Sequence, residues 1–393
     1  MIPAASQASA ATARLVGAAP EATPEAAPLR AGREERDQVR LLAIDTRHGR
    51  LLDRAATDLP ALLFPGDLLV LNDAATLPAS LAGRAPSGAA VEIRLAGPAA
   101  DEGGTWPAVV LGPGDWRTRT EDRAPPEQLA AGDVIRFVDP SAPDRRPAGE
   151  LAAEVAAVSP LSPRLVDLRF DRAGAALFAA LYRVGRPVQY AHQDRDLALW
   201  TVQTAYAGPP WAVEMPSAGR PLSWQILAAL RRRGVELAWL THAAGLSATG
   251  DAAIDAALPL PERYHIPRAT AGAVHRAAAE GRRVIAVGTT VVRALEGAAR
   301  DGHWAGGTGT TDLVLGPHSQ LRAVDGLISG IHAPAESHFR LLGAFAPAPL
   351  LDAAWRRAQA GGYLQHELGD LCLLAPGMAG PTLSETRRPA AGP

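Results

Sequence analysis

The sequence predicts a large α/β domain with a small antiparallel β domain inserted into it. The 393 residues, 47% of them hydrophobic, are enough for two buried cores. Between residues 81 and 164, short apolar runs are separated by Gly, Pro and Asp, a pattern typical of a small antiparallel barrel or sandwich. Outside this stretch, strand and helix patterns alternate. We therefore expect the large domain in residues 26–80 and 165–380, the inserted domain in residues 81–164, and tails in residues 1–25 and 381–393.

The first segment of the chain does not predict a folded structure. Residues 1–25 are rich in Pro and Ala and lack periodicity, so they cannot bury enough apolar surface to offset the entropy of ordering, and we expect a disordered tail. From Arg36 the pattern becomes regular. The segment VRLLAID (39–45) predicts a strand, and FPGDLLVLND (64–73) predicts a Pro-Gly turn followed by a second strand.

The inserted domain is predicted from apolar segments that are too short for helices. Turn-forming residues separate them, as in antiparallel β structures. These segments are AAVEIRLAG (89–97), WPAVVLG (106–112), DVIRFVD (133–139) and, just past the expected end of the domain, LVDLRF (165–170).

After the insertion, the period of the pattern changes. Ile226, Leu227 and Leu230 share one face of a predicted helix that closes at Gly234, and a strand pattern follows. Strand and helix patterns then recur to the end of the domain, so the large domain is predicted to be α/β. The segments are SWQILAALRRRG (223–234), VELAWLTHA (235–243), RRVIAVGTT (282–290), VVRALEGAAR (291–300) and LLDAAWRRAQAGG (350–362).

Composition and charge argue against several classes of protein. The 39 basic residues, all arginine, and 41 acidic residues give a net charge of −2, which provides no overall attraction to nucleic acid. Cys372 is the only cysteine, which excludes an intrachain disulfide and a thiolate metal cluster. No HExxH motif occurs, and we expect no metal site. No apolar run is long enough for a membrane span, so we expect a cytoplasmic protein without a membrane partner.

The most informative local motif is formed by Gly288, Thr289 and Thr290. They follow the apolar segment VIAV (284–287) and precede a predicted helix that contains Arg293. Free N–H groups at the start of a helix favour an anion such as a carboxylate or a phosphate. An ordinary strand–helix connection with a threonine cap explains the same pattern.

Two histidines are candidates for catalysis. His332 lies where a strand-like stretch breaks, four residues before Glu336, and a histidine beside a carboxylate can hold a proton near neutral pH. His242 lies near a strand end, where open α/β sheets place their ligands. A solvated turn and a hydrogen-bonded or exposed histidine are the alternative interpretations. Ser217 and Gly219 belong to a loop of small residues that a ligand can approach, although a plain loop has the same composition.

The order of several segments resembles the S-adenosylmethionine:tRNA ribosyltransferase-isomerase family of the queuosine pathway. The segment closest to the family pattern, VGTTSVRSLE, is VIAVGTTVVRALE here, and the order of segments holds from about residue 30 to 375. The other matching segments are FPGDLLVLNDAATLPASLAGR (64–84), VQTAYA (202–207), MPSAG (215–219) and IHAPAESHF (331–339).

This resemblance implies a large α/β lobe with an inserted small β-barrel, and a specific reaction. The family transfers the ribosyl group of S-adenosylmethionine to 7-aminomethyl-7-deazaguanine in tRNA and isomerises it, which gives epoxyqueuosine, adenine and methionine. S-adenosylmethionine would then be a co-substrate, tRNA a partner, and no cofactor would be bound permanently. We expect a monomer.

The resemblance also implies roles for individual residues. Gly288, Thr289, Thr290 and Arg293 would hold the methionine carboxylate or a phosphate. Proton transfer or substrate positioning would fall to His332 and Glu336, with His242 as a further catalytic candidate. The residues expected to line the pocket are Gln203, Tyr206, Ser217 and Gly219.

The sequence departs from the family pattern at several places near the expected site. The family's Leu-His-Phe is Arg220-Pro221-Leu222 here, and a segment with two family histidines retains only Glu262. Two alternatives therefore stand beside the tRNA enzyme. One is an enzyme that binds S-adenosylmethionine but acts on another acceptor, and the other is a catalytically silent relative that binds RNA or protein.

Overall fold

The structure is a computed structural model that describes residues 35–99, 103–138, 151–300, 302, 304–334 and 336–379. The predicted tails, residues 1–25 and 381–393, lie outside the described residues.

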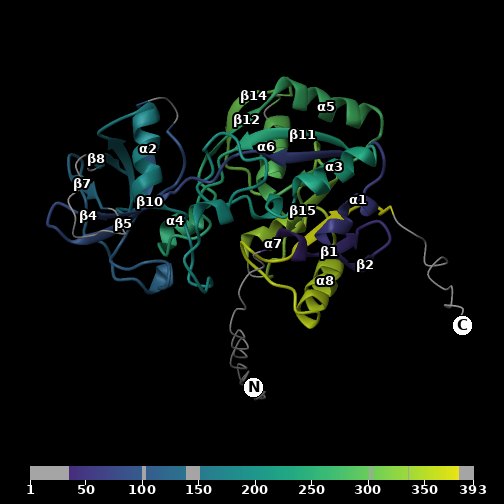
Figure 1. Ribbon diagram of the computed structural model, residues 1–393, viewed down its shortest axis with the longest axis horizontal. Helices are drawn as coiled ribbons and strands as arrows, with labels where there is room; N and C mark the ends of the chain where they lie inside the picture. Colours follow the sequence, from purple (N-terminus) through teal and green to yellow (C-terminus); the bar gives the residue numbers. More distant parts are fainter. Residues whose placement is uncertain are drawn as a thin grey trace, which may run out of the picture. The chain divides into compact units, whose positions relative to one another are not determined.

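The large domain contains a mixed sheet of nine strands (Figure 1). Its four central strands, β11, β3, β13 and β15, are parallel to one another. Every residue of β3, β13 and β15 is buried, as expected for apolar strands covered on both faces. In spatial order the strands are β14 (Gly307–Thr311), β12 (Glu262–Ile266), β11 (Glu236–His242), β3 (Leu68–Asn72), β13 (Val284–Val287), β15 (Gly326–Gly330), β16 (Leu371–Ala375), β1 (Arg40–Asp45) and β2 (Arg50–Ala55).

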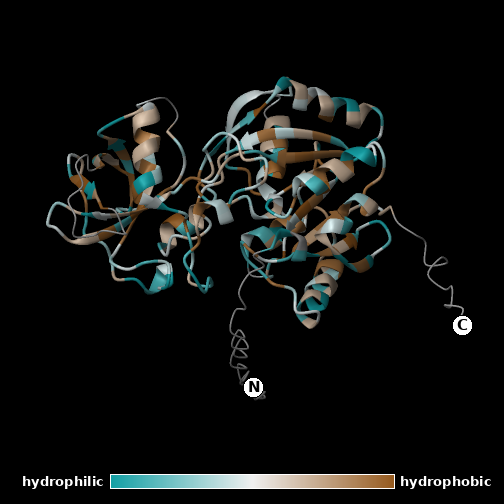
Figure 2. Ribbon diagram, in the orientation of Figure 1, coloured by the Kyte–Doolittle hydropathy of each residue, from teal (hydrophilic) through white to brown (hydrophobic). Residues whose placement is uncertain are grey.

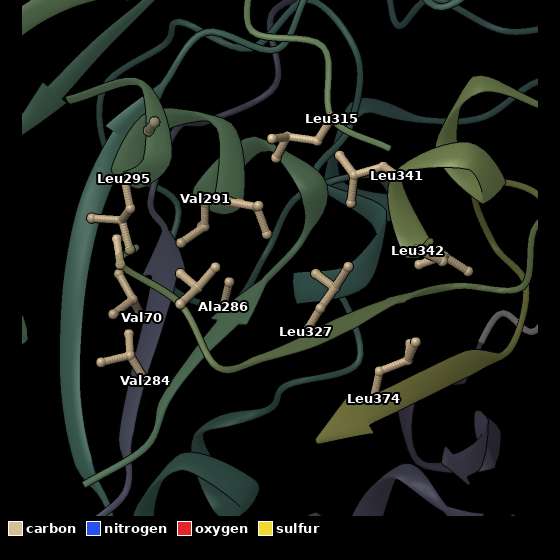
Figure 3. Packing of buried hydrophobic residues seen from close by; sticks show 14 of the residues in the cluster. Val70, Val284, Ala286, Val291, Leu295, Leu315, Leu327, Leu341, Leu342 and Leu374 are labelled. Atoms are coloured by element: carbon tan, nitrogen blue, oxygen red, sulfur yellow. The ribbon is translucent and has the colours of Figure 1, made fainter. Parts of the chain in front are cut away.

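Helices cover both faces of this sheet and bury two separate apolar clusters. Figure 3 shows Val70 and Ala286, from neighbouring strands, packed with Val291 and Leu295 of α6 in the first cluster. The helices that contribute to this cluster are α5 (Arg268–Ala279), α6 (Thr289–Arg300), α7 (Ser337–Leu342) and α8 (Ala348–Ala360). Those that contribute to the cluster on the other face are α1 (Leu59–Leu62) and α3 (Trp224–Arg232).

The second sheet closes into a six-stranded antiparallel barrel through the pairing of β4 with β7. This closure confirms the predicted barrel and decides against a sandwich. The barrel strands, in spatial order, are β4 (Ser80–Arg84), β5 (Ala90–Leu95), β6 (Trp106–Leu111), β9 (Leu165–Phe170), β8 (Ala152–Val158) and β7 (Val134–Phe137), and β10 (Gly185–Arg186) adds to β4.

Helices α2 (Gly174–Val184) and α4 (Ala252–Ala257) contribute apolar residues to the barrel core. In Figure 2 the strands of the large sheet are mostly hydrophobic, whereas many connecting segments are hydrophilic. None of the described helices is long and apolar enough to cross a membrane. The short 3-10 helices are η1 (Arg36–Gln38), η2 (Ala56–Asp58), η3 (Thr120–Asp122), η4 (Leu199–Thr201) and η5 (Ser217–Gly219).

The parallel arrangement brings four strand ends to one edge of the large sheet. Strands β3 and β11 end at Asn72 and His242, β13 leads into Gly288, and β15 leads towards His332. Ligands of open α/β sheets bind outside the carboxyl ends of the parallel strands. A ligand-binding site is therefore expected at this edge.

Candidate functional site

Asn72 ties three of these chain segments together. Its Nδ2 donates to the carbonyl of His242 at 3.0 Å, and its Oδ1 accepts from the His242 N–H at 2.9 Å. The same Nδ2 lies 3.4 Å from Oγ1 of Thr290. One buried amide thus fixes the ends of β3 and β11 against the start of α6, a role for which the sequence analysis did not single out Asn72.

The predicted anion motif forms a tight turn between β13 and α6. Gly288 has φ +91°, a conformation that favours glycine, and its N–H donates to the Ile328 carbonyl at 2.8 Å. Helix α6 begins at Thr289, and the first N–H groups of a helix have no partner within it. A partial positive charge therefore accumulates beside Thr289 and Thr290, where an anion would be stabilised.

The loop of small residues, now η5, lies beside this turn. A Cβ on Gly288 would stand 3.9 Å from the Ala218 side chain. The hydroxyl of Tyr206 donates to the Gly219 carbonyl at 3.3 Å, and a side chain at Gly219 would overlap that hydroxyl. Two predicted binding segments, one with Ser217 and Gly219 and one with Gly288, therefore meet at the same edge.

The side-chain amide of Gln203 is bonded to the backbone of another segment. Its Nε2 donates to the Thr76 carbonyl at 2.8 Å, and its Oε1 accepts from the Thr76 N–H at 2.9 Å. Arg220 is buried and donates to the Thr201 carbonyl at 2.8 Å. Both residues thus fix loops near the site through backbone contacts.

Arg293, Glu262 and His242 form a buried polar cluster. Nη1 of Arg293 pairs with Oε2 of Glu262 at 2.6 Å, and Oε1 of Glu262 accepts from the Gly245 N–H at 2.8 Å. Nε2 of His242 lies 3.4 Å from Oε2 of Glu262. Among the described residues, neither Nδ1 of His242 nor Nη2 of Arg293 has a hydrogen-bond partner, and buried polar atoms normally have one. Both atoms are buried, so only a group that enters this cluster can bond to them.

Burial sets the charges in this cluster. It raises the pKa of Glu262, and the positive charge of Arg293 offsets this increase only in part. Burial and then the charge of Arg293 hold the pKa of His242 well below its ordinary value. His242 is therefore a neutral imidazole at physiological pH, suited to hydrogen bonding and not to donating a proton as an imidazolium.

His332 and Glu336, predicted as a pair, are in direct contact. Nδ1 of His332 lies 3.1 Å from Oε2 of Glu336, and its Nε2 lies 3.0 Å from Oγ of Ser329. Burial raises the pKa of Glu336, but the hydrogen bond and charge of His332 bring it below its ordinary value. The arrangement is that of a base oriented by a carboxylate.

The His332 ring stacks on His338 with the ring centroids 4.8 Å apart and the planes 14° from parallel. Burial, followed by the charge of His332, lowers the pKa of His338 to about 4. His338 is consequently neutral near pH 7. The sequence analysis gave His338 no role.

Two further groups of ionisable residues were missed by the sequence analysis. His192 stacks on His366 and contacts Glu367. Glu214 accepts hydrogen bonds from the Tyr190 hydroxyl and, at 2.8 Å, from the Ser247 N–H, and burial raises its pKa to about 7. The members of each group are distant in sequence, so no local pattern revealed either group. In the part of the chain that the structure describes, no group of three or more His, Cys, Asp and Glu residues is arranged to hold a metal.

The comparisons of this chain with known proteins agree with one another on its family. The family model described as "Queuosine biosynthesis protein" matches residues 20–374. The S-adenosylmethionine:tRNA ribosyltransferase-isomerase of Thermus thermophilus is 36% identical over 353 residues, which cover 87% of this chain and 94% of that protein. The enzyme of the same name from Anaeromyxobacter dehalogenans is 37% identical over 362 residues and covers 90% and 97% of the two chains.

A crystal structure of the S-adenosylmethionine tRNA ribosyltransferase from Thermotoga maritima aligns with 88% of this chain and 96% of its own, at 24% identity and a TM-score of 0.47. The family model and the curated relatives each extend over most of the sequence. The chain therefore belongs to the queuosine biosynthesis protein family.

Proposed function

We propose that this chain is an S-adenosylmethionine:tRNA ribosyltransferase-isomerase. The observation that supports it most strongly is the 36% and 37% identity to enzymes of that name along nearly their whole length. In the proposed reaction, the ribosyl group of S-adenosylmethionine is transferred to 7-aminomethyl-7-deazaguanine in tRNA and isomerised to epoxyqueuosine. Adenine and methionine are released.

This reaction requires an anion site for the amino-acid part of the co-substrate. The turn of Gly288, Thr289 and Thr290 offers free N–H groups and the positive end of the α6 dipole, which suit the methionine carboxylate. Nη2 of Arg293 is buried without a partner among the described residues and would donate a further hydrogen bond. We propose that the carboxylate binds at this turn.

The reaction also requires a base, because the positive sulfur acidifies the adjacent C5′ methylene of the ribose. We propose that Nε2 of His332 takes this proton when the Ser329 hydroxyl turns aside. Glu336, bonded to the other ring nitrogen, would stabilise the resulting imidazolium. The unpartnered Nδ1 of His242 would exchange a hydrogen bond with the ribose.

The remaining predicted residues would shape the pocket. Tyr206 and Gly219 keep η5 close to the Gly288 turn, and Ser217 lies at the start of that short helix. Gln203 would act indirectly, by fixing the backbone of Thr76. These residues would form or position the walls of the site and would not react.

The test is incubation of the purified protein with S-adenosylmethionine, with and without tRNA that contains 7-aminomethyl-7-deazaguanine, followed by mass spectrometry of the small molecules and nucleosides. Adenine, methionine and epoxyqueuosine are expected only in the presence of this tRNA. Breakdown of S-adenosylmethionine without modification of the tRNA would favour another acceptor. No breakdown in either sample would favour a silent relative.

The proposed base has its own test. The variants His332→Ala and Glu336→Ala should each turn over about 100-fold more slowly, which is the lower end of the rate enhancement that general acid–base catalysis gives. His318→Ala is the matched control, because His318 is exposed on a connecting segment. Unchanged turnover in both site variants would contradict the assignment.

A further inference from the structure

The second histidine pair joins two segments that are far apart in the sequence. His192 follows the short strand β10, whereas His366 and Glu367 immediately precede β16. Nε2 of His192 contacts Oε2 of Glu367, which also accepts from Nε2 of Gln193 at 3.1 Å. The rings of His192 and His366 stack with centroids 4.1 Å apart and planes 21° from parallel. This group therefore contains an imidazole oriented by a carboxylate, like the pair of His332 and Glu336.

Strand register places this group at the same sheet edge as the proposed site. Strand β16 runs antiparallel to β15, and Leu371, at the start of β16, pairs with Gly330, at the end of β15. The Ile331 N–H donates to the Asp370 carbonyl at 3.3 Å. His332, just after β15, and His366, just before β16, therefore leave the sheet at one edge.

Electrostatic effects agree with this proximity. The charge of His366 contributes to the low pKa of Glu336, behind the opposing effect of burial and the larger effect of His332. The charge of Glu367 acts on the pKa of His338, for which burial is the largest cause. The two histidine pairs thus influence each other across one region.

The backbone at His366 is in an uncommon conformation. Its φ of +68° lies in the left-handed region, which costs a residue other than glycine about 1 kcal/mol or more. The His366 carbonyl accepts from the Gly369 N–H at 3.1 Å, which closes the turn before β16. The two residues that contact His192, His366 and Glu367, thus lie at the start of this closed turn.

The proposed reaction has a second proton transfer that the site described above does not supply. When the base removes the C5′ proton, the electrons of the C5′–H bond form the C4′–C5′ double bond. The electrons of the C4′–O4′ bond move to O4′, which forms the C1′ carbonyl. As this carbonyl forms, the bond between C1′ and N9 breaks, and its electron pair leaves with adenine, which needs a proton. His332 is assigned to the first proton, and His242 is held neutral by burial and by Arg293.

We propose that His192, oriented by Glu367 and stacked on His366, donates the proton to the departing adenine. This inference rests on the proposed function. Glu367 holds Nε2, and Nδ1 of His192, which has no partner among the described residues, carries the proton that moves to the purine. The side chain of His192 is 16% exposed, so solvent returns the proton after turnover. Glu367 and His366 are positioning residues in this scheme.

The test compares His192→Gln and Glu367→Gln with His318→Gln, the exposed control. The expected result for His192→Gln is a loss of about 100-fold in kcat for adenine release, with KM little changed. Glu367→Gln should give a smaller loss of the same kind. The dissociation constant for S-adenosylmethionine should stay within about twofold in both variants.

A substrate with a better leaving group distinguishes a proton donor from a structural residue. In an analogue of S-adenosylmethionine with 2-fluoroadenine, the purine is less basic and leaves with less need of a proton. We expect this analogue to recover at least about tenfold of the rate lost in His192→Gln. Equal losses with both substrates, in this variant and in Glu367→Gln, would overturn the inference.

The failure of this inference differs from the failure of the proposed function. If the wild-type protein releases adenine in the presence of the tRNA and His192→Gln matches His318→Gln, His192 is not the donor and the proposed function stands. If the wild-type protein releases no adenine under any condition, the proposed function fails, and this inference fails with it.

Discussion

The buried carboxyl group of Glu214 should make the stability of the folded protein depend on pH. Burial raises its pKa from 4.5 to about 7, against the opposing hydrogen bonds of Tyr190 and Ser247. Because the folded-state pKa lies above the unfolded value, the folded protein binds this proton more tightly. The resulting stabilisation is fully present below about pH 4.5 and is lost as the pH rises through about 7.

The magnitude follows from the size of the shift. A shift of about 2.5 pKa units corresponds to about 3 kcal/mol over the complete titration. From about pH 5.5 to about pH 8.5, the folded protein should lose about 2 kcal/mol of this contribution. Glu214→Gln is uncharged at every pH and similar in size, so the variant should lack this part of the pH dependence.

The assay is urea unfolding of the wild-type protein and of Glu214→Gln over that pH range, with stability obtained by linear extrapolation. Subtracting one profile from the other cancels the titration of groups common to both. Glu154→Gln is the matched control, because Glu154 is exposed on β8. Profiles of the wild type and Glu214→Gln that run parallel within about 0.5 kcal/mol would refute the reasoning.

Two further predictions concern the core of the site. Arg293→Leu should lower the free energy of unfolding by about 3–5 kcal/mol, because it leaves Glu262 buried without its ion-pair partner. Adding Glu262→Gln should restore part of that loss in urea unfolding, and strictly additive losses would show that the two residues do not act as a pair. Gly219→Ala should weaken binding of S-adenosylmethionine by about tenfold or more in calorimetry, because the new methyl group displaces the Tyr206 hydroxyl. Unchanged affinity would show that η5 is not part of the binding site.

Much of the fold could be predicted from the sequence, because local patterns determine it. The apolar strand before Gly288 and the helix after it are confirmed as β13 and α6, and the predicted helix that closes at Gly234 is confirmed as α3. The closed barrel could not be distinguished from a sandwich, because closure depends on the pairing of β4 with β7 and not on any local pattern.

The candidate site was only partly predictable for a similar reason. His332 and Glu336 are four residues apart, so sequence spacing was enough to suggest their contact. The contact of His192 with Glu367 joins positions separated by 175 residues, and no local pattern indicates it.

The free donors at the site depended on the tertiary structure as well. Gln203 and Arg293 were both predicted to contact the ligand. In the structure the amide of Gln203 is bonded to Thr76, and Arg293 pairs with Glu262 but retains one free nitrogen. A sequence identifies polar side chains, whereas only the folded chain shows which of their atoms already have partners.

The most direct test of the central proposal follows the ribosyl group itself. The protein is incubated with S-adenosylmethionine uniformly labelled with carbon-13 in the ribose and with tRNA that contains 7-aminomethyl-7-deazaguanine. The nucleosides of the recovered tRNA are then analysed by mass spectrometry. The proposal predicts that all the labelled ribose carbons appear in epoxyqueuosine while unlabelled adenine is released. Release of adenine with no label in the tRNA would contradict it.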